Sequence, residues 1–205
     1  QIYNKKGIPQ SKAGIIPWMF IDWTHAKANA ESMYNNDKYK NYVKSGLITG
    51  TQWDTILNIM VSKSAISASD LTNSAAWGNY IDNSISYNGR LASADYNVTN
   101  SKAWTLKPFG TKGAGTTKKY SSTSGDLLTT GASATTERYH IFDLAGNLWE
   151  WTEETSLYAT SGQYHVVRGS VYVSPSNDYP ACYRSRSTAS ATGLNIGFRT
   201  VLYIK

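Results

Sequence analysis

The feature that most constrains the fold is the stretch from Ile141 to Thr152, which reads Ile-Phe-Asp-Leu-Ala-Gly-Asn-Leu-Trp-Glu-Trp-Thr. Two apolar residues lead into Asp-x-x-Gly-Asn, a turn pattern whose glycine stands where a positive φ is easiest to adopt. Trp149 and Trp151 are two residues apart, so on a strand they share one face while Glu150 takes the other. Each indole buries roughly 200 Å² when it is packed. This stretch therefore predicts a tight turn followed by a core strand.

The same stretch resembles the signature of a known family. Asp143 to Trp151 is similar to the D-hydrophobic-x-G-N-V-W-E-W sequence of the formylglycine-generating enzymes, also called sulfatase-modifying factors. The resemblance implies an α+β, C-type-lectin-like fold, loop-rich, with two early helices packed on small antiparallel sheets. Further matching blocks follow in the family's order: Trp23 with Ala26, Trp53, Trp77-Gly78-Asn79, Arg168-Gly169 and Gly197-Phe198-Arg199.

Length and composition predict one domain over residues 1–205, in which residues 1–14 form an N-terminal segment before the fold proper. Only 17% of the residues are charged, while Tyr 15, Trp 7 and Gly 16 are high. This mixture favours a turn-rich α+β or mostly β domain over a helical bundle. Because the chain begins at Gln1 and not at Met, we expect a trimmed piece or the C-terminal module of a longer protein.

Charge and cysteine content exclude several classes of function. The formal net charge is +6, but the lysines and arginines are scattered without a stripe or arm, so we expect no nucleic-acid partner. No apolar run approaches the roughly 20 residues of a membrane span, so we expect no membrane insertion. Cys182 is the one cysteine, which excludes an intramolecular disulfide and a multi-cysteine zinc site. We expect no organic cofactor.

Two helices and one early strand are predicted from local patterns. Trp18 to Ile21 is expected to be a short buried strand, and a helix is expected from Thr24 to Tyr34, capped by Asp22 or Thr24. A second helix follows Thr49, which forms a capping-box pattern with Gln52. Its apolar residues recur at i, i+3, i+4 and i+7: Trp53, Ile56, Leu57 and Met60.

The enzymatic members of the family oxidise a sulfatase cysteine to formylglycine with a copper-binding pair of cysteines. Soft Cu(I) prefers thiolate ligands, and Cys182 alone cannot supply a pair. The run Cys182-Tyr183-Arg184-Ser185-Arg186 nevertheless resembles the enzymes' C-Y-R-Y-R. We therefore expect a protein that is not an enzyme, with a degenerate copper oxidase as the alternative. The three histidines lack metal-pair spacing and are interpreted as local hydrogen-bonding residues: His25, His140 and His165.

The family resemblance also implies a structural Ca²⁺ ion at the Gly-Asn turn. Its ligands would be the side chains of Asp143 and Glu150 and the carbonyls of Gly146 and Leu148. Hard oxygen donors gathered by a tight turn suit this ion. In the alternative, Asp143 caps the turn and Glu150 pairs with a buried arginine such as Arg168 or Arg199. The sequence leaves both interpretations open.

Residues 168–199 are the candidate ligand-binding region. They are crowded with Tyr, Ser, Asn, Asp and Thr, which make adaptable contact surfaces. Their position and alphabet resemble the variable region of the target proteins of diversity-generating retroelements. The candidate contact residues are Tyr172, Ser174, Ser176, Asn177, Asp178, Tyr179, Tyr183, Ser185, Ser187, Thr188, Ser190 and Thr192.

That resemblance implies a non-enzymatic domain that binds a protein or glycan receptor on a cell surface. It would belong to a phage tail or to a bacterial surface protein, so the expected location is the virion tail or the bacterial cell surface. Two alternatives stay open, an ordinary polar loop and a structural tail component that self-associates. The oligomeric state is also left open.

Overall fold

The two predicted helices form, and each follows its predicted cap. In the computed structural model, helix α1 (Trp23–Ser32) begins after Asp22, whose carboxylate accepts a hydrogen bond of 2.9 Å from the His25 amide. Helix α2 (Gly50–Ser62) begins after Thr49, and both hydrogen bonds of the capping box with Gln52 are present. The apolar face of α2 buries Trp53, Leu57 and Met60.

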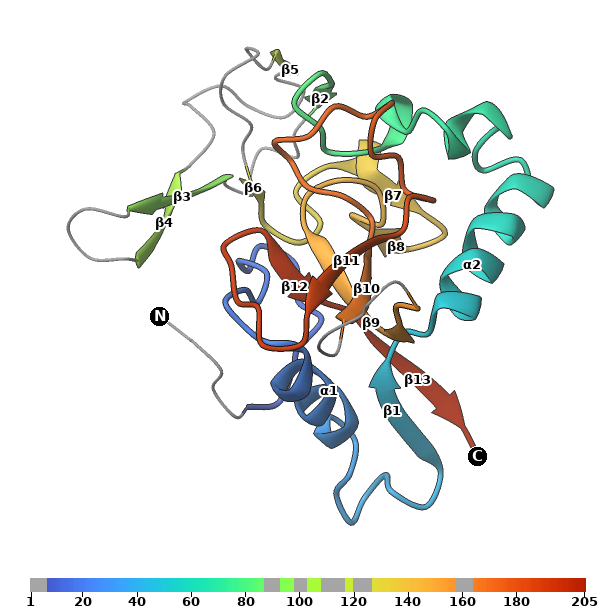
Figure 1. The fold of residues 1–205 in the computed structure, drawn as a ribbon, viewed down its shortest axis with the longest axis vertical. Helices are drawn as coiled ribbons and strands as arrows, with labels where there is room; N and C mark the ends of the chain where they lie inside the picture. Colours follow the sequence, from blue (N-terminus) through green and yellow to red (C-terminus); the bar gives the residue numbers. More distant parts are fainter. Residues whose placement is uncertain (1–6, 87–92, 98–102, 108–116, 120–126, 158–163) are drawn as a thin grey trace.

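The structure describes residues 7–86, 93–97, 103–107, 117–119, 127–157 and 164–205. Figure 1 shows an α+β arrangement in which α1 and α2 lie beside several small sheets. This confirms the predicted fold class.

The stretch that carries the two tryptophans is the centre of the largest sheet. Strand β9 (Trp149–Thr155) lies between β10 (Tyr164–Arg168) and β12 (Ile196–Phe198), and β11 (Ser185–Thr188) completes the order β11-β10-β9-β12. The β9–β10 and β10–β11 pairs are antiparallel, whereas β12 runs parallel to β9. The sequence predicted antiparallel sheets, so this parallel pair differs from the expectation.

The remaining described strands form two-stranded sheets and one three-stranded sheet. Strand β1 (Val43–Leu47) pairs with β13 (Thr200–Ile204) in an antiparallel ribbon at the lower right of Figure 1. The other strands are β2 (Ser84–Ser86), β3 (Ser93–Asn97), β4 (Ala103–Lys107), β5 (Thr117–Lys119), β6 (Leu127–Leu128), β7 (Glu137–Arg138) and β8 (Ile141–Phe142). The three-stranded sheet has the order β4-β3-β6. Three 3-10 turns complete the description: η1 (Ser69–Leu71), η2 (Ala75–Trp77) and η3 (Ala134–Thr136).

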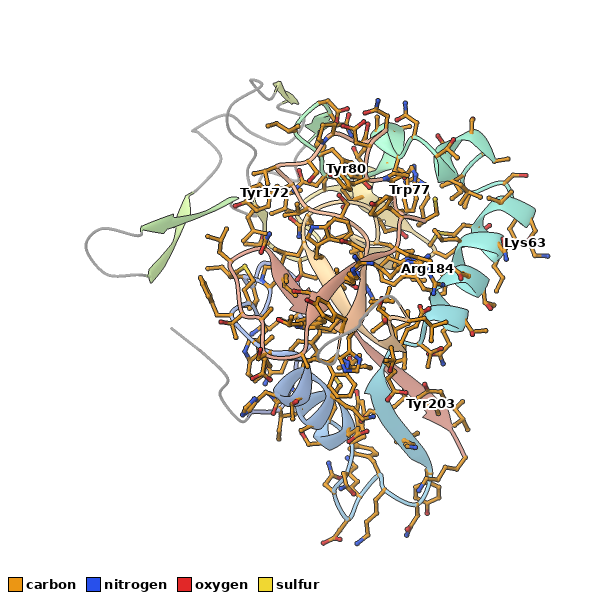
Figure 2. The ribbon with its side chains drawn as sticks, in the orientation of Figure 1. Lys63, Trp77, Tyr80, Tyr172, Arg184 and Tyr203 are labelled. Carbon is orange, nitrogen blue, oxygen red and sulfur yellow. The ribbon has the colours of Figure 1, made fainter. Side chains whose placement is uncertain are left out.

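Two large apolar clusters form the core of the described residues, beside a small third cluster of Met19, Leu127 and Leu148. One packs α1 against β9, so that Trp149 and Trp151 share a face as predicted, and the Trp151 indole donates to the Ile21 carbonyl at 2.9 Å. The other packs α2 against Trp77 and Tyr80, which Figure 2 shows at the same end of the molecule.

Two local expectations are wrong. Trp18 to Ile21 is not a strand, because Phe20 has a φ of 56° and its amide bonds to the Gly193 carbonyl in a loop. Met19 and Ile21 are buried all the same. The His165 side chain is also not a hydrogen-bonding group, since neither ring nitrogen has a partner among the described residues and the ring stacks on Trp23 with centroids 3.6 Å apart.

Candidate functional site

The Gly-Asn turn holds several residues in the left-handed region. Asp143, Gly146 and Asn147 have φ values of 56°, 71° and 65°. Gly146 lies against the backbone of Asn79, where a Cβ would collide with the Asn79 carbonyl. Its amide donates a 2.6 Å hydrogen bond to the Gly169 carbonyl. Both the backbone conformation and the close approach therefore require glycine here.

Asn147 joins three distant segments. Its side-chain oxygen accepts hydrogen bonds of 2.9 Å from the Leu128 amide and from the Asn79 side chain. Its side-chain nitrogen donates to the Leu128 carbonyl at 3.2 Å, and its backbone carbonyl accepts from the Tyr172 amide at 3.1 Å. Because Asn147 is buried, these bonds satisfy polar groups that water does not reach. The turn thereby fixes the start of the candidate ligand-binding region.

The predicted metal ligands make contacts within the protein. Glu150 binds the Arg199 guanidinium through both oxygens, at 2.7 and 2.8 Å, which confirms the ion pair that the sequence offered as the alternative. Asp143 accepts from the Thr136 hydroxyl at 2.7 Å. Burial raises the pKa of Asp143 to about 6, although the Thr136 hydrogen bond and the Arg199 charge act in the opposite direction. The Gly146 carbonyl accepts from the Leu148 amide at 2.9 Å.

These contacts bear on the calcium prediction. The Arg199 charge acts on both carboxylates, so a guanidinium already supplies positive charge where Ca²⁺ was expected. Among the residues that the structure describes, no group of three or more His, Cys, Asp and Glu side chains is placed to hold a metal. With Asp143 and Glu150 engaged in this way, the donor set does not fit Ca²⁺ without rearrangement. The contacts therefore favour the alternative, in which both carboxylates bind within the protein, and the calcium site stays an untested expectation of the sequence.

The first support of the candidate ligand-binding surface is Ser176. We call residues 174–184 the presenting loop. Ser176 is 1% exposed, and its amide donates to both oxygens of Asp82 at 3.1 Å. Its hydroxyl bonds to Asp82 at 2.9 Å and to Asn73 at 3.2 Å. The prediction that Ser176 contacts a ligand is therefore wrong, since the side chain is a buried support of the loop.

The second support lies at Ala181 and Cys182. The Ala181 amide donates to the Ser74 hydroxyl at 3.0 Å, and its carbonyl accepts from the Trp53 indole at 3.0 Å. The Cys182 thiol donates to the Leu71 carbonyl at 2.7 Å. Burial raises the pKa of this thiol, which favours the neutral form. The presenting loop is thus fixed by the Trp53 side chain of α2, by side chains between residues 73 and 82, and by the Leu71 carbonyl.

Between these supports the loop presents an exposed group. Asn177, Asp178 and Tyr179 are exposed, and Tyr183 follows the second support. The tyrosine rings are 37% and 40% exposed, and they pack edge to face with centroids 5.1 Å apart. Both also contact Trp149, at 6.0 and 6.2 Å between centroids. The first tryptophan of the central motif therefore supports the exposed tyrosine pair.

The other predicted contact residues fall into two groups. Thr188, Ser190 and Thr192 are exposed at the end of β11 and in the turn that follows it. That turn adjoins the start of α1, because the Trp23 amide bonds to the Ala189 carbonyl at 3.0 Å. The remaining residues are half-buried: Tyr172, Ser174, Ser185 and Ser187. The structure thus separates an exposed loop patch from a second patch beside α1.

A charge network that the sequence did not reveal joins α2, β9 and β10 to the last residue of the presenting loop. Arg168 is fully buried and pairs with Asp54 at 2.5 Å, not with Glu150. Two of its guanidinium nitrogens have no hydrogen-bond partner in the part of the chain that the structure describes, and the guanidinium lies 5.7 Å from the Trp53 ring centroid. Arg184, which Figure 2 labels, lies 3.9 Å from the other Asp54 oxygen and pairs with Glu154. Asp54 therefore lies between the buried and the exposed arginine.

The fold and the Gly-Asn turn define an α+β domain of the C-type-lectin-like class. The model of the family described as "Sulfatase-modifying factor enzyme 1-like domain" matches residues 4–204, and the chain belongs to this family. The crystal structure of CarF is similar, with a TM-score of 0.56 and 12% sequence identity over 91% of this chain and 67% of the CarF chain. At that identity the likeness shows a common fold. No curated protein matches the chain.

Proposed function

We propose that this chain is a non-enzymatic domain that binds a ligand or receptor through the presenting loop. The observation that carries the proposal is the arrangement of this loop. Its backbone is fixed at Ser176 and at Ala181, while Asn177, Asp178 and Tyr179 between them face solvent. A loop fixed in advance loses less conformational entropy when it binds a partner.

The exposed residues suit a contact surface. Tyrosines supply a large contact area at a low entropy cost, and Asn or Asp side chains supply adaptable hydrogen bonds. Because the supports lie elsewhere, exposed positions such as Asn177 and Asp178 can change without loss of the fold. This separation fits a domain diversified by a retroelement. The proposed setting is a phage tail or a bacterial surface, with a protein or glycan receptor on a cell.

The alternative function is that of a copper oxidase acting on a sulfatase cysteine. Membership of the family leaves this alternative open, but the chain has one cysteine where the enzymes of the family use a pair. The Cys182 thiol is engaged with the Leu71 carbonyl, and its raised pKa disfavours the thiolate that binds copper. A structural tail component is a further alternative, and it predicts tight self-association instead of ligand binding.

The test uses fluorescently labelled protein and a panel of intact bacterial cells, read by flow cytometry. We expect Asn177→Ala/Asp178→Ala/Tyr179→Ser to lose cell binding and to remain folded in a thermal melt. The matched control, Asn58→Ala/Tyr139→Ser, removes an exposed amide and an exposed ring elsewhere and should keep binding. Equal binding by both variants would contradict the proposal. Oxygen consumption by the purified protein with copper and a cysteine peptide would establish the oxidase.

A further inference from the structure

A basic tip lies at one end of the molecule. We define it as Tyr39, Lys40, Tyr42, Lys44, Ile204 and Lys205. These residues come from the loop between α1 and β1 and from the ends of the β1–β13 ribbon, at the bottom of Figure 1. Tyr42 is 70% exposed and Ile204 is 89% exposed, so large apolar side chains stand in solvent next to lysines.

Positive charge at the basic tip exceeds negative charge. The nearby acids are already paired, Asp37 with Lys40 at 2.5 Å and Glu31 with Lys27 at 2.6 Å. In the described part of the chain, Lys44 and Lys205 form no ion pair with a carboxylate, and the Lys205 ammonium donates a hydrogen bond to the Lys40 carbonyl, which carries no net charge. The tip therefore offers uncompensated positive charge to an anionic partner.

The tip also contains a pocket of about 270 Å³. Three lysines and one acid line it, Lys40, Lys44 and Lys205 with Glu31, around Tyr34 and Val43, so positive side chains outnumber negative ones. Lysine stems cover apolar surface while their ammonium groups stay in water. Such a pocket suits an anionic group that is attached to an apolar body.

We propose that the basic tip docks on the surface of a bilayer that contains anionic lipids. The negative surface potential of such a bilayer attracts lysine side chains, and tyrosine side chains favour the level of the lipid headgroups. Nucleic acid would use the lysines but would gain little from the exposed Ile204 and Leu202. The docking is peripheral. None of the helices in the described residues is long and apolar enough to cross a membrane.

Docking at the tip is compatible with ligand binding elsewhere. In Figure 1 the tip lies at the bottom, whereas the presenting loop lies in the upper part of the view. A domain held by its tip would therefore keep the presenting loop away from the bilayer. The docking proposal does not depend on the proposed function, because it uses none of the presenting-loop residues.

Vesicle sedimentation tests the proposal with the whole chain. Phosphatidylcholine vesicles with phosphatidylglycerol should bind the protein, and vesicles of phosphatidylcholine alone should bind it much less. Lys44→Gln/Lys205→Gln should weaken binding about fivefold for each lysine removed, and added salt should weaken it further. Tyr42→Ser/Ile204→Ser should also weaken it, because apolar area is lost. Free inorganic phosphate alone should not bind the basic tip in place of the vesicles.

Matched controls make the result decisive. Ile59→Ser/Lys63→Gln removes a half-exposed isoleucine from α2 and the lysine that follows this helix. A single lysine accompanies the apolar side chains there, so this variant should leave vesicle binding unchanged. All of these positions are exposed, so thermal melts should show folded variants. Equal binding to both kinds of vesicle, or loss in the control and not in the tip variants, would overturn the proposal. Tip-dependent binding to duplex DNA without vesicle binding would assign the tip to nucleic acid.

Discussion

The sharpest stability prediction concerns Asp54, the carboxylate next to buried Arg168. Replacing Asp54 by Asn keeps the shape of the side chain and removes its charge. The Arg168 side chain is 0% exposed, and two of its guanidinium nitrogens already lack a hydrogen-bond partner within the described ranges. It would then be a buried cation without an anion, with the neutral amide oxygen of the substituted side chain and the Trp53 ring as its contacts. We expect Asp54→Asn to be strongly destabilising.

The magnitude follows from the burial of the two partners. Breaking a buried pair by removing one partner costs about 3–5 kcal/mol. The Asp54 side chain is 47% exposed, so water compensates part of the loss, and we expect about 2–3 kcal/mol. In a domain of this size that corresponds to a fall in Tm of about 5–10 °C. Arg168→Met should cost less, because it leaves a half-exposed carboxylate beside Arg184.

A double-mutant cycle by urea denaturation measures this coupling. In the Arg168→Met background, Asp54→Asn should cost almost nothing, which gives a coupling energy of about 2 kcal/mol. The reasoning would be refuted if Asp54→Asn alone cost under about 1 kcal/mol. It would also be refuted if its cost were the same in both backgrounds.

Three further predictions test the Gly-Asn turn. Because the folded state raises the pKa of Asp143 from 3.8 to about 6, it binds the proton more tightly than the unfolded state, and this carboxyl should make stability fall as pH rises from 3.8 to about 6. Asp143→Asn should remove that slope from the free energy of unfolding measured against pH. Gly146→Ala should cost more than about 3 kcal/mol in urea unfolding, because it adds backbone strain and a collision with Asn79, and a cost below 1 kcal/mol would contradict this geometry. Calcium and EDTA should give the same Tm because Arg199 neutralises Glu150, and a higher Tm in calcium would establish the metal site.

Local patterns predicted the parts of the fold that depend on neighbouring residues. The capping box at Thr49 and Gln52 and the alternation of Trp149 with Trp151 involve contacts within a few positions, and both formed as expected. The strand predicted from Trp18 to Ile21 did not form, because Phe20 adopts a backbone conformation that a strand does not allow. A positive φ at Phe20 is uncommon for an aromatic residue, and nothing in the adjoining sequence signals it.

The supports of the candidate site were not predictable because they join distant segments. Ser176 bonds to Asp82, which is 94 positions earlier, and Asp54 pairs with Arg168, which is 114 positions later. The residues from Val61 to Arg138 show weak periodicity, so the role of residues 71–82 was missed. The sequence does not distinguish a serine that supports the loop from a serine that contacts a ligand. Only the burial of the side chain in the structure separates these two roles.

The most direct test of the central claim is the tolerance of the presenting loop to substitution. Each position of the presenting loop from 174 to 184, and Trp149 beneath its tyrosine pair, would be saturated, and folding would be scored by protease resistance on a display platform without any ligand. We predict that Asn177 and Asp178 accept most residues with little loss of stability, whereas Ser176 and Trp149 do not. If Asn177 and Asp178 proved as intolerant as Ser176, the exposed group would belong to the fold itself and the account would be contradicted.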